Sequence, residues 1–467
     1  MQAMKLRDIL ANIDHSECLA SNLDLEIQGV EFDSRKVKAG DLFVPLTGGA
    51  SDGHSYIQAA IDQGAVACFW SASADQAPSD QLAVIVVEDT LKAMQELAHY
   101  YRQVLDPIVI GITGSNGKTT TKDMTAQVLI AKYHVHKTQG NYNNEIGLPY
   151  TLLQMPADTE VVVCEMGMSG FGEIQALSQL AEPDIVAITL IGESHLEHLG
   201  SRAGIAQAKL EILQGLKSGG VFFYPGAEPL IQSCWPSLDE PVKAYSFGAS
   251  SDYDIYSYDI IEEPKQTIFQ TNLDPNIRCV IPVIGAYNVN NALIALGIAR
   301  ELEVPIEQAI FQLSQFKLTA NRLEWLTTQA GTLLLNDAYN ASPTSMRAVL
   351  ASLSNIDLDN KGKRYAILGD IRELGPDSAQ LHRELSDAID PQAIDGVYLF
   401  GPEMKHLYEA LLDKYPASDL FYEASDHQVL INRLKADLQP DDMALVKSSF
   451  GVDLLQVVTA LTGHPTK

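Results

Sequence analysis

Residues 108–121 constrain the fold of this chain more than any other segment. They read IVIGITGSNGKTTT, so apolar β-forming residues lead into a turn rich in Gly, Ser and Asn that ends where a helix can begin. Gly114 and Gly117 let backbone N–H groups approach a triphosphate, and the helix dipole stabilises its negative charge. Lys118 can reach the β- and γ-phosphates, and the Thr119 hydroxyl suits Mg2+. The segment therefore predicts a strand, a phosphate-binding loop and a helix.

The loop matches only the shorter G-x-x-G-K-T form of a phosphate-binding loop. Ile112 stands where the eight-residue Walker pattern has glycine. A glycine-rich turn with an exposed lysine is the alternative. We favour a nucleotide site because the loop lies between a hydrophobic strand and a helix. The candidate nucleotide-binding residues of the loop are Gly114, Ser115, Asn116, Gly117, Lys118, Thr119 and Thr120.

Length and charge limit the class of protein. A chain of 467 residues is too long for one hydrophobic core and predicts about three domains. Its net charge of -28 repels nucleic acid and anionic membranes, so we expect no nucleic-acid partner. The five cysteines form no C-x-x-C pair and are odd in number, which favours free thiols in a reducing compartment. There is no secretory h-region or membrane-length apolar run, so we expect a cytoplasmic protein without membrane insertion.

Residues 1–88 alternate short strands with turns, which predicts a small α/β domain. Two of its loops carry polar residues of interest, Ser34-Arg35 and Asp52-Gly53-His54. An exposed polar turn is an equally good interpretation of each loop. We predict strands over 23–32, 42–46 and 84–87 and a helix over 57–63.

From residue 89 the chain alternates longer strands and helices, which predicts a parallel sheet whose ligands gather at the carboxyl ends of the strands. Thr119, Glu165 and His195 each lie just past a predicted strand, so they should meet at one edge. A carboxylate and an imidazole near a phosphate loop can hold divalent ions that bridge ATP oxygens. Strands are predicted near 135 and over 160–164 and 184–190, with strand character over 253–284. Helices are predicted over 121–132 and from the segment 285–292, which opens an Ala-rich helix, to about 302.

Several polar residues in this region have more than one interpretation. His195 and His198 are three apart and could suggest zinc, but H-L-E-H fits no zinc signature well. Lys209, on a predicted helix, is by itself best explained as a solvated lysine. Asn288 and Asn291 lie on one face at the start of a helix, where their amides could bind the edge of a base. Capping of that helix by Asn288 is the alternative.

After Phe316 a further domain begins. Strands predicted over 332–336, 364–368, 396–400 and 443–446 alternate with helical segments, which indicates a second doubly wound α/β unit without a phosphate loop of its own.

Motifs spread over nearly the whole chain carry a family resemblance. The chain resembles the Mur ligases of bacterial cell-wall synthesis, and most closely the branch that adds D-Ala-D-Ala. The N-terminal D-S-R domain and the D-A-Y-N-A segment favour this branch over the folylpolyglutamate synthetases, which share the other two domains. The motifs are, in order, D-S-R with G-D-L-F-V-P-L, D-G-H, T-G-S-N-G-K-T-T-T, N-Y-N-N-E-I-G-L-P, E-M-G, H-L-E with A-K, N-V-N-N-A, N-D-A-Y-N-A-S-P and G-D-I-R-E-L-G.

The resemblance implies an ATP-dependent, ADP-forming ligase that joins D-Ala-D-Ala to UDP-N-acetylmuramoyl-tripeptide through an acyl phosphate, in peptidoglycan biosynthesis. It implies an N-terminal domain over 1–88 that binds the UDP substrate and a central P-loop-type parallel-sheet domain over 89–317 that binds ATP. A C-terminal Rossmann-like domain over 318–467 would close over the nucleotide about a hinge near 316–321. We expect a monomer. A sister ligase with another amine substrate and a nucleotide-hydrolysing switch protein are the alternatives.

The resemblance also implies roles for individual residues. Lys209 falls at the position of a lysine that CO2 carbamylates, which would turn a cation into an anion that ligates or orients Mg2+. Ser342 and Ile371 depart mildly from the family pattern, where Asn and Met are usual. The implied catalytic residues are Lys118, Lys209 and His195, and the implied magnesium ligands are Thr119, Glu165, His195 and Lys209. Asn288 and Asn291 would face adenine, Arg322 and Asp337 would reach the nucleotide, Ser34 and Arg35 would bind UDP, and Asn141, Asn143 and Asn144 would line the muramoyl-peptide site.

Overall fold

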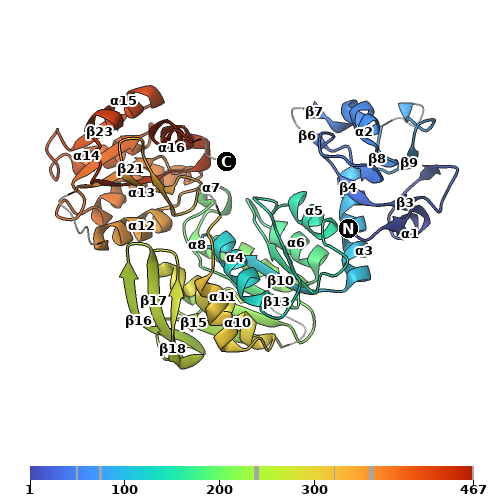
Figure 1. Ribbon diagram of the computed structural model, residues 1–467, viewed down its shortest axis with the longest axis horizontal. Helices are drawn as coiled ribbons and strands as arrows, with labels where there is room; N and C mark the ends of the chain where they lie inside the picture. The colour runs from blue at the N-terminus through green and yellow to red at the C-terminus, as the bar shows by residue number, and fades with distance from the viewer. Residues whose placement is uncertain (49–50, 73–75, 236–240, 320, 357–361, 465–467) are drawn as a thin grey trace.

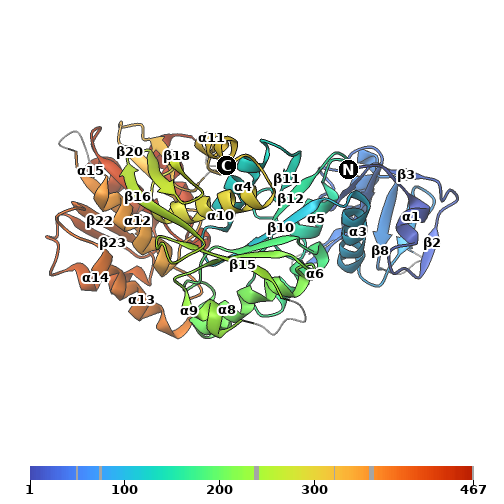
Figure 2. The ribbon, with the colours of Figure 1, turned by 90° about the horizontal axis from the view of Figure 1, so that it is seen from below.

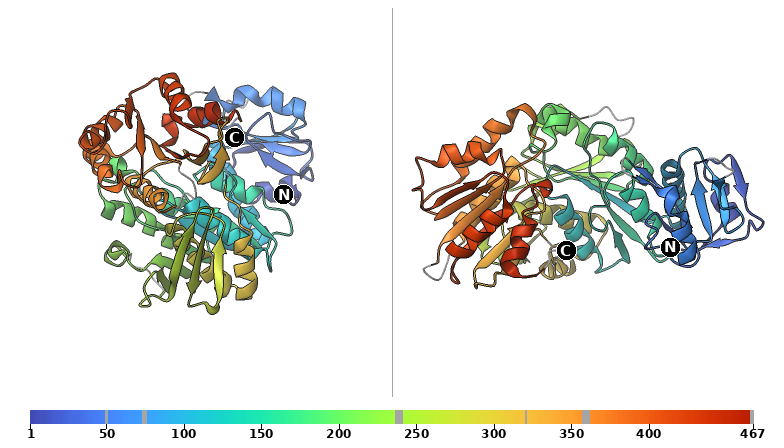
Figure 3. Two further views of the ribbon diagram at one scale, coloured as in Figure 1. Left: turned by 60° about the vertical axis from the view of Figure 1, so that its left-hand side comes forward. Right: turned by 90° about the horizontal axis from the view of Figure 1, so that it is seen from above.

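The computed structural model describes residues 1–48, 51–72, 76–235, 241–319, 321–356 and 362–464. Three α/β units follow one another along the chain, and the first and third lie at opposite ends of the central unit (Figures 1 and 2). Figure 3 shows the same arrangement from two further sides. Within the described residues, no helix combines the length and apolar character needed to cross a membrane. All five cysteines are free, as predicted.

The N-terminal unit is built on a five-stranded sheet. Its strands are parallel except β2, which pairs antiparallel with β9 at one edge. The helix predicted over 57–63 is confirmed as α2 (Ile57–Gln63). The strand predicted over 23–32 is instead two short strands, because Gln28 between them donates its backbone N–H to Gly40 O. The sheet order is β2 (Glu17–Leu19), β9 (Ala83–Val86), β8 (Ala67–Trp70), β5 (Asp41–Phe43) and β4 (Gly29–Glu31); β1 (Met4–Lys5) pairs with β3 (Glu26–Ile27), β6 (Thr47–Gly48) pairs with β7 (Ser51–Asp52), and α1 spans Leu6–Leu10.

Helix α3 (Thr90–Leu105) joins the first unit to the second. Asp89 caps it by accepting from the backbone N–H groups of Leu91 and Lys92. Tyr101 in this helix is fully buried and donates its hydroxyl to Met155 O, 2.8 Å away. The helix therefore packs against the central unit as well as leading into it.

The central unit contains a nine-stranded sheet. Strands β10, β12 and β13 are almost wholly buried, as expected for parallel strands covered on both faces. In the register Ile112 of β10 lies opposite Glu165 of β12, and Thr113 opposite Ile188 of β13, so the carboxyl ends of the three strands meet. The order is β11 (Val135–Lys137), β12 (Val161–Glu165), β10 (Ile108–Thr113), β13 (Ile185–Ile188), β14 (Val221–Pro225), β15 (Lys243–Gly248), β16 (Ile255–Glu263), β17 (Gln266–Thr271) and β18 (Asp274–Ile281).

Strands β11 to β16 of this sheet pair in parallel, and β17 and β18 add antiparallel strands at one edge. Strands β14 and β15 were not predicted. Helix α4 (Lys118–Leu129) begins three residues before the predicted start, because Gly117 has φ +84 and accepts the N–H of Thr121 as the first turn forms. The remaining helices are α5 (Gly147–Leu153), α6 (Glu173–Ala181), α7 (Leu196–Leu199), α8 (Arg202–Leu210), α9 (Pro229–Ser233), α10 (Tyr287–Glu301) and α11 (Ile306–Ser314).

The third unit has a six-stranded sheet that is parallel except for its edge strand β19, so the predicted doubly wound α/β unit is confirmed. Its helix α12 (Pro343–Asn355) lies beside the antiparallel strands of the central unit, and Ser352 donates to Glu262 Oε2 at 3.1 Å (Figure 1). The order is β19 (Glu324–Thr327), β20 (Leu333–Asp337), β24 (Met443–Lys447), β21 (Arg364–Gly369), β22 (Gly396–Phe400) and β23 (Leu420–Glu423), with helices α13 (Ser378–Glu384), α14 (Met404–Leu411), α15 (His427–Asp437) and α16 (Leu455–Thr462).

The segment between the second and third units contains the predicted hinge over 316–321. Thr319 donates its hydroxyl to Asp123 Oδ2 of α4 at 2.5 Å, which ties the segment to the helix that follows the phosphate loop. Ala320 lies outside the described residues. Leu323 has φ +46, an uncommon conformation for a residue with a bulky side chain. The hinge itself stays a prediction.

Candidate active site

A cavity of about 840 Å3 lies at the carboxyl ends of β10 and β12, and residues of the third unit close one side of it. The prediction that groups distant in sequence meet at this edge is therefore confirmed. Gly114, Lys209, Ser34 and Arg35 are not among its lining residues. The predicted residues that line it are Ser115, Asn116, Gly117, Lys118, Thr119, Thr120, Asn141, Asn143, Asn144, Glu165, His195, Asn288, Asn291, Arg322 and Asp337.

Gly114 and Gly117 of the loop lie too close to neighbouring side chains to carry a side chain of their own. Gly114 has φ +149, and a Cβ there would lie 1.8 Å from Thr189 Oγ1. Gly117 has φ +84, and a Cβ would lie 2.7 Å from Asn291 Oδ1. Both positions combine a conformation that favours glycine with a neighbour too near for a side chain. The loop thus has the geometry of a phosphate-binding turn, in which backbone N–H groups precede a helix N-terminus.

Lys118 curls back over this loop and donates its Nζ to Gly114 O at 2.8 Å. Desolvation lowers the pKa of its ammonium; Glu165 acts in the opposite direction, and Arg322 lowers the pKa further. Lys118 therefore lies within electrostatic reach of a carboxylate from the central unit and a guanidinium from the third unit.

Glu165 ends β12 and is 2% exposed. Its Oε1 accepts from Asn143 Nδ2 at 2.8 Å, whereas its buried Oε2 has no hydrogen-bond partner in the described part of the chain. A buried, unpaired carboxylate oxygen is costly, and a divalent cation would remove that cost. No group of three His, Cys, Asp or Glu side chains gathers among the described residues, so a cation here would also need hydroxyl or phosphate oxygens. Thr119, itself 3% exposed, supplies such a hydroxyl.

His195 precedes α7 with φ +58, and its Nδ1 lies 2.5 Å from Glu373 Oε2 of the third unit. Desolvation lowers the pKa of the imidazole, Glu373 acts to raise it, and the cations Lys118 and Lys209 lower it. The ring is therefore neutral near neutral pH. His198, the second histidine of the zinc alternative, is exposed and does not line the cavity.

Lys209 lies in the last turn of α8 and is 2% exposed, so its interpretation as a solvated helical lysine is wrong. Desolvation lowers the pKa of its amine well below the usual value, and Lys118 lowers it further. Across the described ranges no hydrogen bond or ion pair satisfies its Nζ. Burial therefore makes this amine give up its proton, and so become nucleophilic, more readily than an exposed lysine does.

Asn288 and Asn291 line the cavity and also join α10 to α4. Asn288 Nδ2 donates to Ile284 O at 2.8 Å, and its Oδ1 accepts from Asn291 Nδ2 at 2.9 Å. Asn291 Oδ1 accepts from Thr121 Oγ1 at 3.0 Å. The capping alternative is wrong, because Ala286 is the N-cap residue of α10 and Asn288 bonds a preceding carbonyl. Each amide keeps part of its hydrogen-bonding capacity for a ligand.

Residues of the third unit complete the cavity. Arg322 lies over the ring of Tyr339, 4.4 Å from its centroid. Asp337 Oδ2 accepts from Lys447 Nζ at 2.5 Å, and the same ammonium donates to Asn340 O at 2.9 Å. Tyr339 and Lys447 line the cavity, but sequence reasoning gave neither a role. Lys447 could have been identified as a cavity residue by its position at the carboxyl end of β24, the criterion that identified Glu165.

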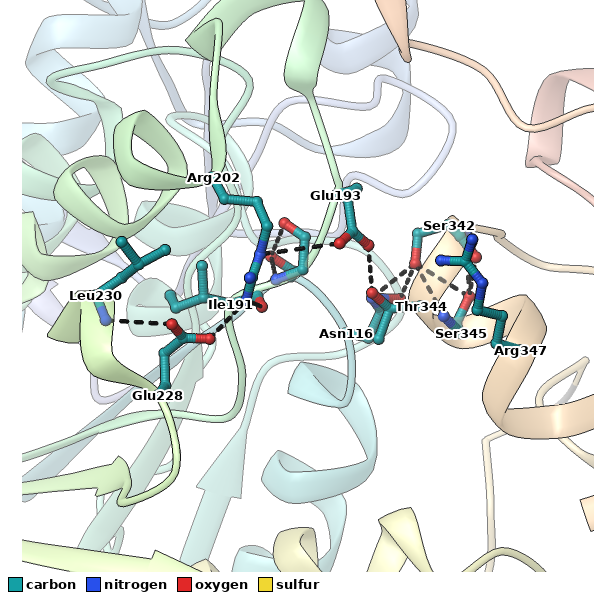
Figure 4. Close-up of polar contacts among 12 residues, drawn as sticks. Asn116, Ile191, Glu193, Arg202, Glu228, Leu230, Ser342, Thr344, Ser345 and Arg347 are labelled. Atoms are coloured by element: carbon teal, nitrogen blue, oxygen red, sulfur yellow. Dashed lines mark hydrogen bonds and ion pairs between the residues drawn. The ribbon is translucent and has the colours of Figure 1, made fainter. Parts of the chain in front are cut away.

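Two side-chain contacts hold the start of α12 against the central unit, one at the phosphate loop and one at the segment after β13 (Figure 4). Asn116 Nδ2 donates to Ser342 Oγ at 2.9 Å, and Thr344 Oγ1 donates to Glu193 Oε2. Glu193 also lies 3.8 Å from Arg202 Nε, so it stands between a cation of the central unit and a hydroxyl of the third unit. Ser342, which departs from the family pattern, is thus a helix N-cap that also reaches the loop.

Replacing Ser342 with Ala should destabilise the third unit. Ser342 and Ser345 form a capping box at α12, and loss of an N-cap hydroxyl costs about 1 kcal/mol. For a domain of this size that corresponds to a fall in Tm of about 2–4 °C in thermal unfolding. Ser354→Ala, which removes a hydroxyl near the other end of the same helix, is the matched control. Equal Tm values for the two variants would contradict the capping role.

The N-terminal candidates lie outside the cavity. Arg35 is exposed and pairs with Asp33 at 2.8 Å, which lowers the pKa of Asp33 to about 2. Asp52 accepts from the backbone N–H of His54 and lies 2.6 Å from its Nδ1, so the D-G-H segment stabilises its own turn. The structure therefore does not bring Ser34 and Arg35 to the phosphate loop.

Side-chain contacts nevertheless connect the N-terminal unit to the segment that lines the cavity. Phe32, two residues before Ser34, packs edge-on against Tyr142 and Tyr150 of the central unit. Tyr150 also donates its hydroxyl to Glu31 Oε2 at 2.8 Å. Tyr142 lies between Asn141 and Asn143, which line the cavity, so the N-terminal unit packs against a segment of the cavity wall.

The chain matches known families along most of its length. Residues 26–102 match the Mur ligase family catalytic domain, residues 112–299 the Mur ligase middle domain, and residues 321–450 the Mur ligase glutamate ligase domain. It is 43% identical to UDP-N-acetylmuramoyl-tripeptide--D-alanyl-D-alanine ligase of Bacillus subtilis over 94% of each chain.

Solved structures agree with the sequence relatives. MurF from Acinetobacter baumannii superposes with a TM-score of 0.86 at 28% identity, covering 99% of this chain and 100% of that one. MurF ligase from Thermotoga maritima in complex with ADP has a TM-score of 0.79 at 27% identity, over 92% and 96% of the two chains. The chain therefore belongs to the Mur ligase family, in the branch of the UDP-N-acetylmuramoyl-tripeptide--D-alanyl-D-alanine ligases.

Proposed function

We propose that this chain is an ATP-dependent, ADP-forming ligase that joins D-Ala-D-Ala to UDP-N-acetylmuramoyl-tripeptide in peptidoglycan biosynthesis. The observation that carries the proposal is the convergence of a phosphate loop, a buried carboxylate with an unpaired oxygen and a neutral imidazole on one cavity. The relatives named above bear the name of that activity, and one solved relative binds ADP. The cavity spans the central unit and the third unit, which suits the assembly of several substrates.

ATP binds with its phosphates on the loop of residues 114–120, where backbone N–H groups and the N-terminus of α4 face the negative charge. Lys118 exchanges its bond to Gly114 O for the β- and γ-phosphate oxygens. Asn288 and Asn291 supply amides to the adenine edge. The third unit supplies Arg322 and Asp337 to the nucleotide.

Mg2+ fits this site because Glu165 Oε2 lacks a partner within the structure described here. Thr119, Glu165, His195 and a carbamylated Lys209 would hold it. When bound, the ion supplies positive charge to the phosphate oxygens during transfer. Hydroxyl and carboxylate oxygens are ordinary ligands of hard divalent cations.

Carbamylation of Lys209 requires the deprotonated form of its amine, which burial favours. The nitrogen lone pair attacks the carbon of CO2, an N–C bond forms, and the nitrogen loses a proton. The product is an anion in place of a buried amine that has no partner in the described ranges. Its position beside Lys118 and His195 places that anion next to a cation and to the proposed metal ligands.

Peptide-bond formation then proceeds in two steps. The terminal carboxylate of the tripeptide attacks the γ-phosphorus of ATP, an O–P bond forms, and ADP leaves as an acyl phosphate is made. Lys118 neutralises charge on the transferred group. The free amine of D-Ala-D-Ala attacks the acyl carbon, loses a proton and expels phosphate. Asn141, Asn143 and Asn144 line the cavity beside Glu165 and hold the muramoyl peptide, while Ser34 and Arg35 hold the UDP end.

Phosphate release provides the test. Purified protein with ATP and UDP-N-acetylmuramoyl-tripeptide should release phosphate in proportion to product only when D-Ala-D-Ala is added. Phosphate release triggered by a single amino acid in place of D-Ala-D-Ala would indicate a sister ligase. Release triggered by glutamate with a folate acceptor would indicate a folylpolyglutamate synthetase. Phosphate release that needs no acceptor carboxylate would instead favour a nucleotide switch. Absence of a new peptide bond by mass spectrometry would overturn the proposal.

A further inference from the structure

Glu373 of the third unit contacts the central unit through both its side chain and its backbone. It lies in the loop after β21, and its Oε2 is 2.5 Å from His195 Nδ1. Its carbonyl accepts from the backbone N–H of Glu197 in α7 at 3.2 Å. Gly375 lies so near that an added Cβ would be 3.2 Å from Glu197 Cα. The loop is therefore docked on the segment that carries His195.

Both partners of this hydrogen bond have left-handed backbone conformations. His195 has φ +58 and Glu373 has φ +61. For residues other than glycine this conformation is unfavourable and persists only where the surrounding structure enforces it. The conformations place the two side chains face to face across the domain boundary. The backbone conformation of both residues therefore helps to fix the contact between His195 and Glu373.

The chemistry of the pair fixes which ring nitrogen carries the proton. A carboxylate accepts hydrogen bonds and donates none, so in this contact His195 Nδ1 is the donor. A neutral imidazole has one N–H, which leaves a lone pair on Nε2. In the described part of the chain Nε2 has no hydrogen-bond partner, and His195 lines the cavity. Carboxylates that hold the far nitrogen of a ligating histidine act in this way in metal sites.

We infer that Glu373 is a positioning residue for the ligase reaction: it holds His195 in the Nδ1–H tautomer with Nε2 available to the cavity, and it does so only while the third unit is docked. Docking of the third unit against the central unit and selection of the Nδ1–H tautomer of His195 then occur together. This inference rests on the function proposed above.

Nitrogen NMR of the full-length protein reports the tautomer directly, without substrates or metal. Long-range 1H–15N spectra should show His195, assigned by comparison with His195→Gln, as the Nδ1–H tautomer. Glu373→Ala should shift its population toward the Nε2–H form, whereas Glu373→Gln, which keeps an acceptor oxygen, should retain the Nδ1–H form. A wild-type spectrum in the Nε2–H form, or one that Glu373→Ala leaves unchanged, would overturn the inference.

Steady-state kinetics provide the second readout. Glu373→Ala should lower kcat by about 10- to 100-fold, the usual cost of losing such an outer partner. The KM for ATP should change by less than about 2-fold, because Glu373 does not line the cavity. Glu373→Gln should recover most of the lost kcat. Glu409→Ala, an exposed glutamate of α14 in the same unit, is the control and should match wild type.

The failures of the two proposals are distinguishable. If the wild-type protein makes no peptide bond, the proposed function is wrong. If the wild-type protein is active and Glu373→Ala matches it in kcat, the inference is wrong. Thermal unfolding separates loss of fold from loss of positioning: should Glu373→Ala unfold, a folded Glu373→Gln that loses the Nδ1–H signature but keeps the wild-type kcat, or that keeps the signature but has a low kcat, would contradict the inference.

Discussion

Replacing Lys118 with Ala should reduce the rate of phosphate release by at least about 10^3-fold, because one preorganised cation is removed from the transferring phosphate. The loop N–H groups and the start of α4 remain, so binding of a non-hydrolysable ATP analogue should weaken far less than kcat. The measurement is phosphate release with both peptide substrates present, together with calorimetric titration of the ATP analogue.

The structure supplies a matched control for this variant. Lys132 follows the same helix α4, but its Nζ is exposed and donates to Leu302 O on the surface. Lys132→Ala should keep activity close to that of wild type. A Lys118→Ala protein within about tenfold of wild-type activity would remove the lysine from phosphoryl transfer, since a preorganised donor is worth more than that.

The strand-end rule explains why the main site could be predicted. Thr119, Glu165 and His195 follow β10, β12 and β13, which are neighbours in one parallel sheet, so their meeting needs only sheet topology. The same periodicity and turn signals place most strands of the three units and, with shifted ends, helices such as α4. The elements and site residues that were predicted correctly are those that depend on contacts between residues near in sequence or on the order of strands in a sheet.

The burial of a side chain by packing between helices could not be predicted from the sequence in the same way. Lys209 lies in A-Q-A-K-L-E-I-L, a pattern that equally suits a solvated lysine. Its burial depends on how α8 packs against neighbouring elements such as α6 and α7, which no local pattern encodes. The family resemblance gave Lys209 its expected role, and the structure supplies the buried, unpaired amine that such a role requires.

Contacts between units were beyond sequence reasoning for a further reason. Glu373 meets His195, and Thr344 meets Glu193, only because segments of the central and third units lie against each other. Such contacts depend on the relative placement of two sheets, and hydrophobic periodicity contains no information about it.

Replacing Lys209 with Ala should abolish ligase activity, with a loss of about 10^2- to 10^3-fold or more, because the anion that carbamylation would place beside the metal ligands is removed. Short carboxylic acids such as acetate or propionate should restore part of the activity, since they can return a carboxylate to the vacated volume. Lys435→Ala, an exposed lysine of α15, is the control and should need no rescue.

A chemical measurement separates carbamylation from a purely structural role of the amine. Wild-type protein equilibrated with 13C-labelled bicarbonate should show a carbamate carbon signal by NMR that Lys209→Ala lacks, because burial favours the deprotonated amine that attacks CO2. Removing dissolved CO2 should lower the wild-type rate, and adding bicarbonate should restore it, whereas neither treatment should affect the acetate-rescued variant. A fully active Lys209→Ala protein without added acid would exclude Lys209 from the reaction, and a wild-type enzyme indifferent to CO2 with no carbamate signal would exclude the modification.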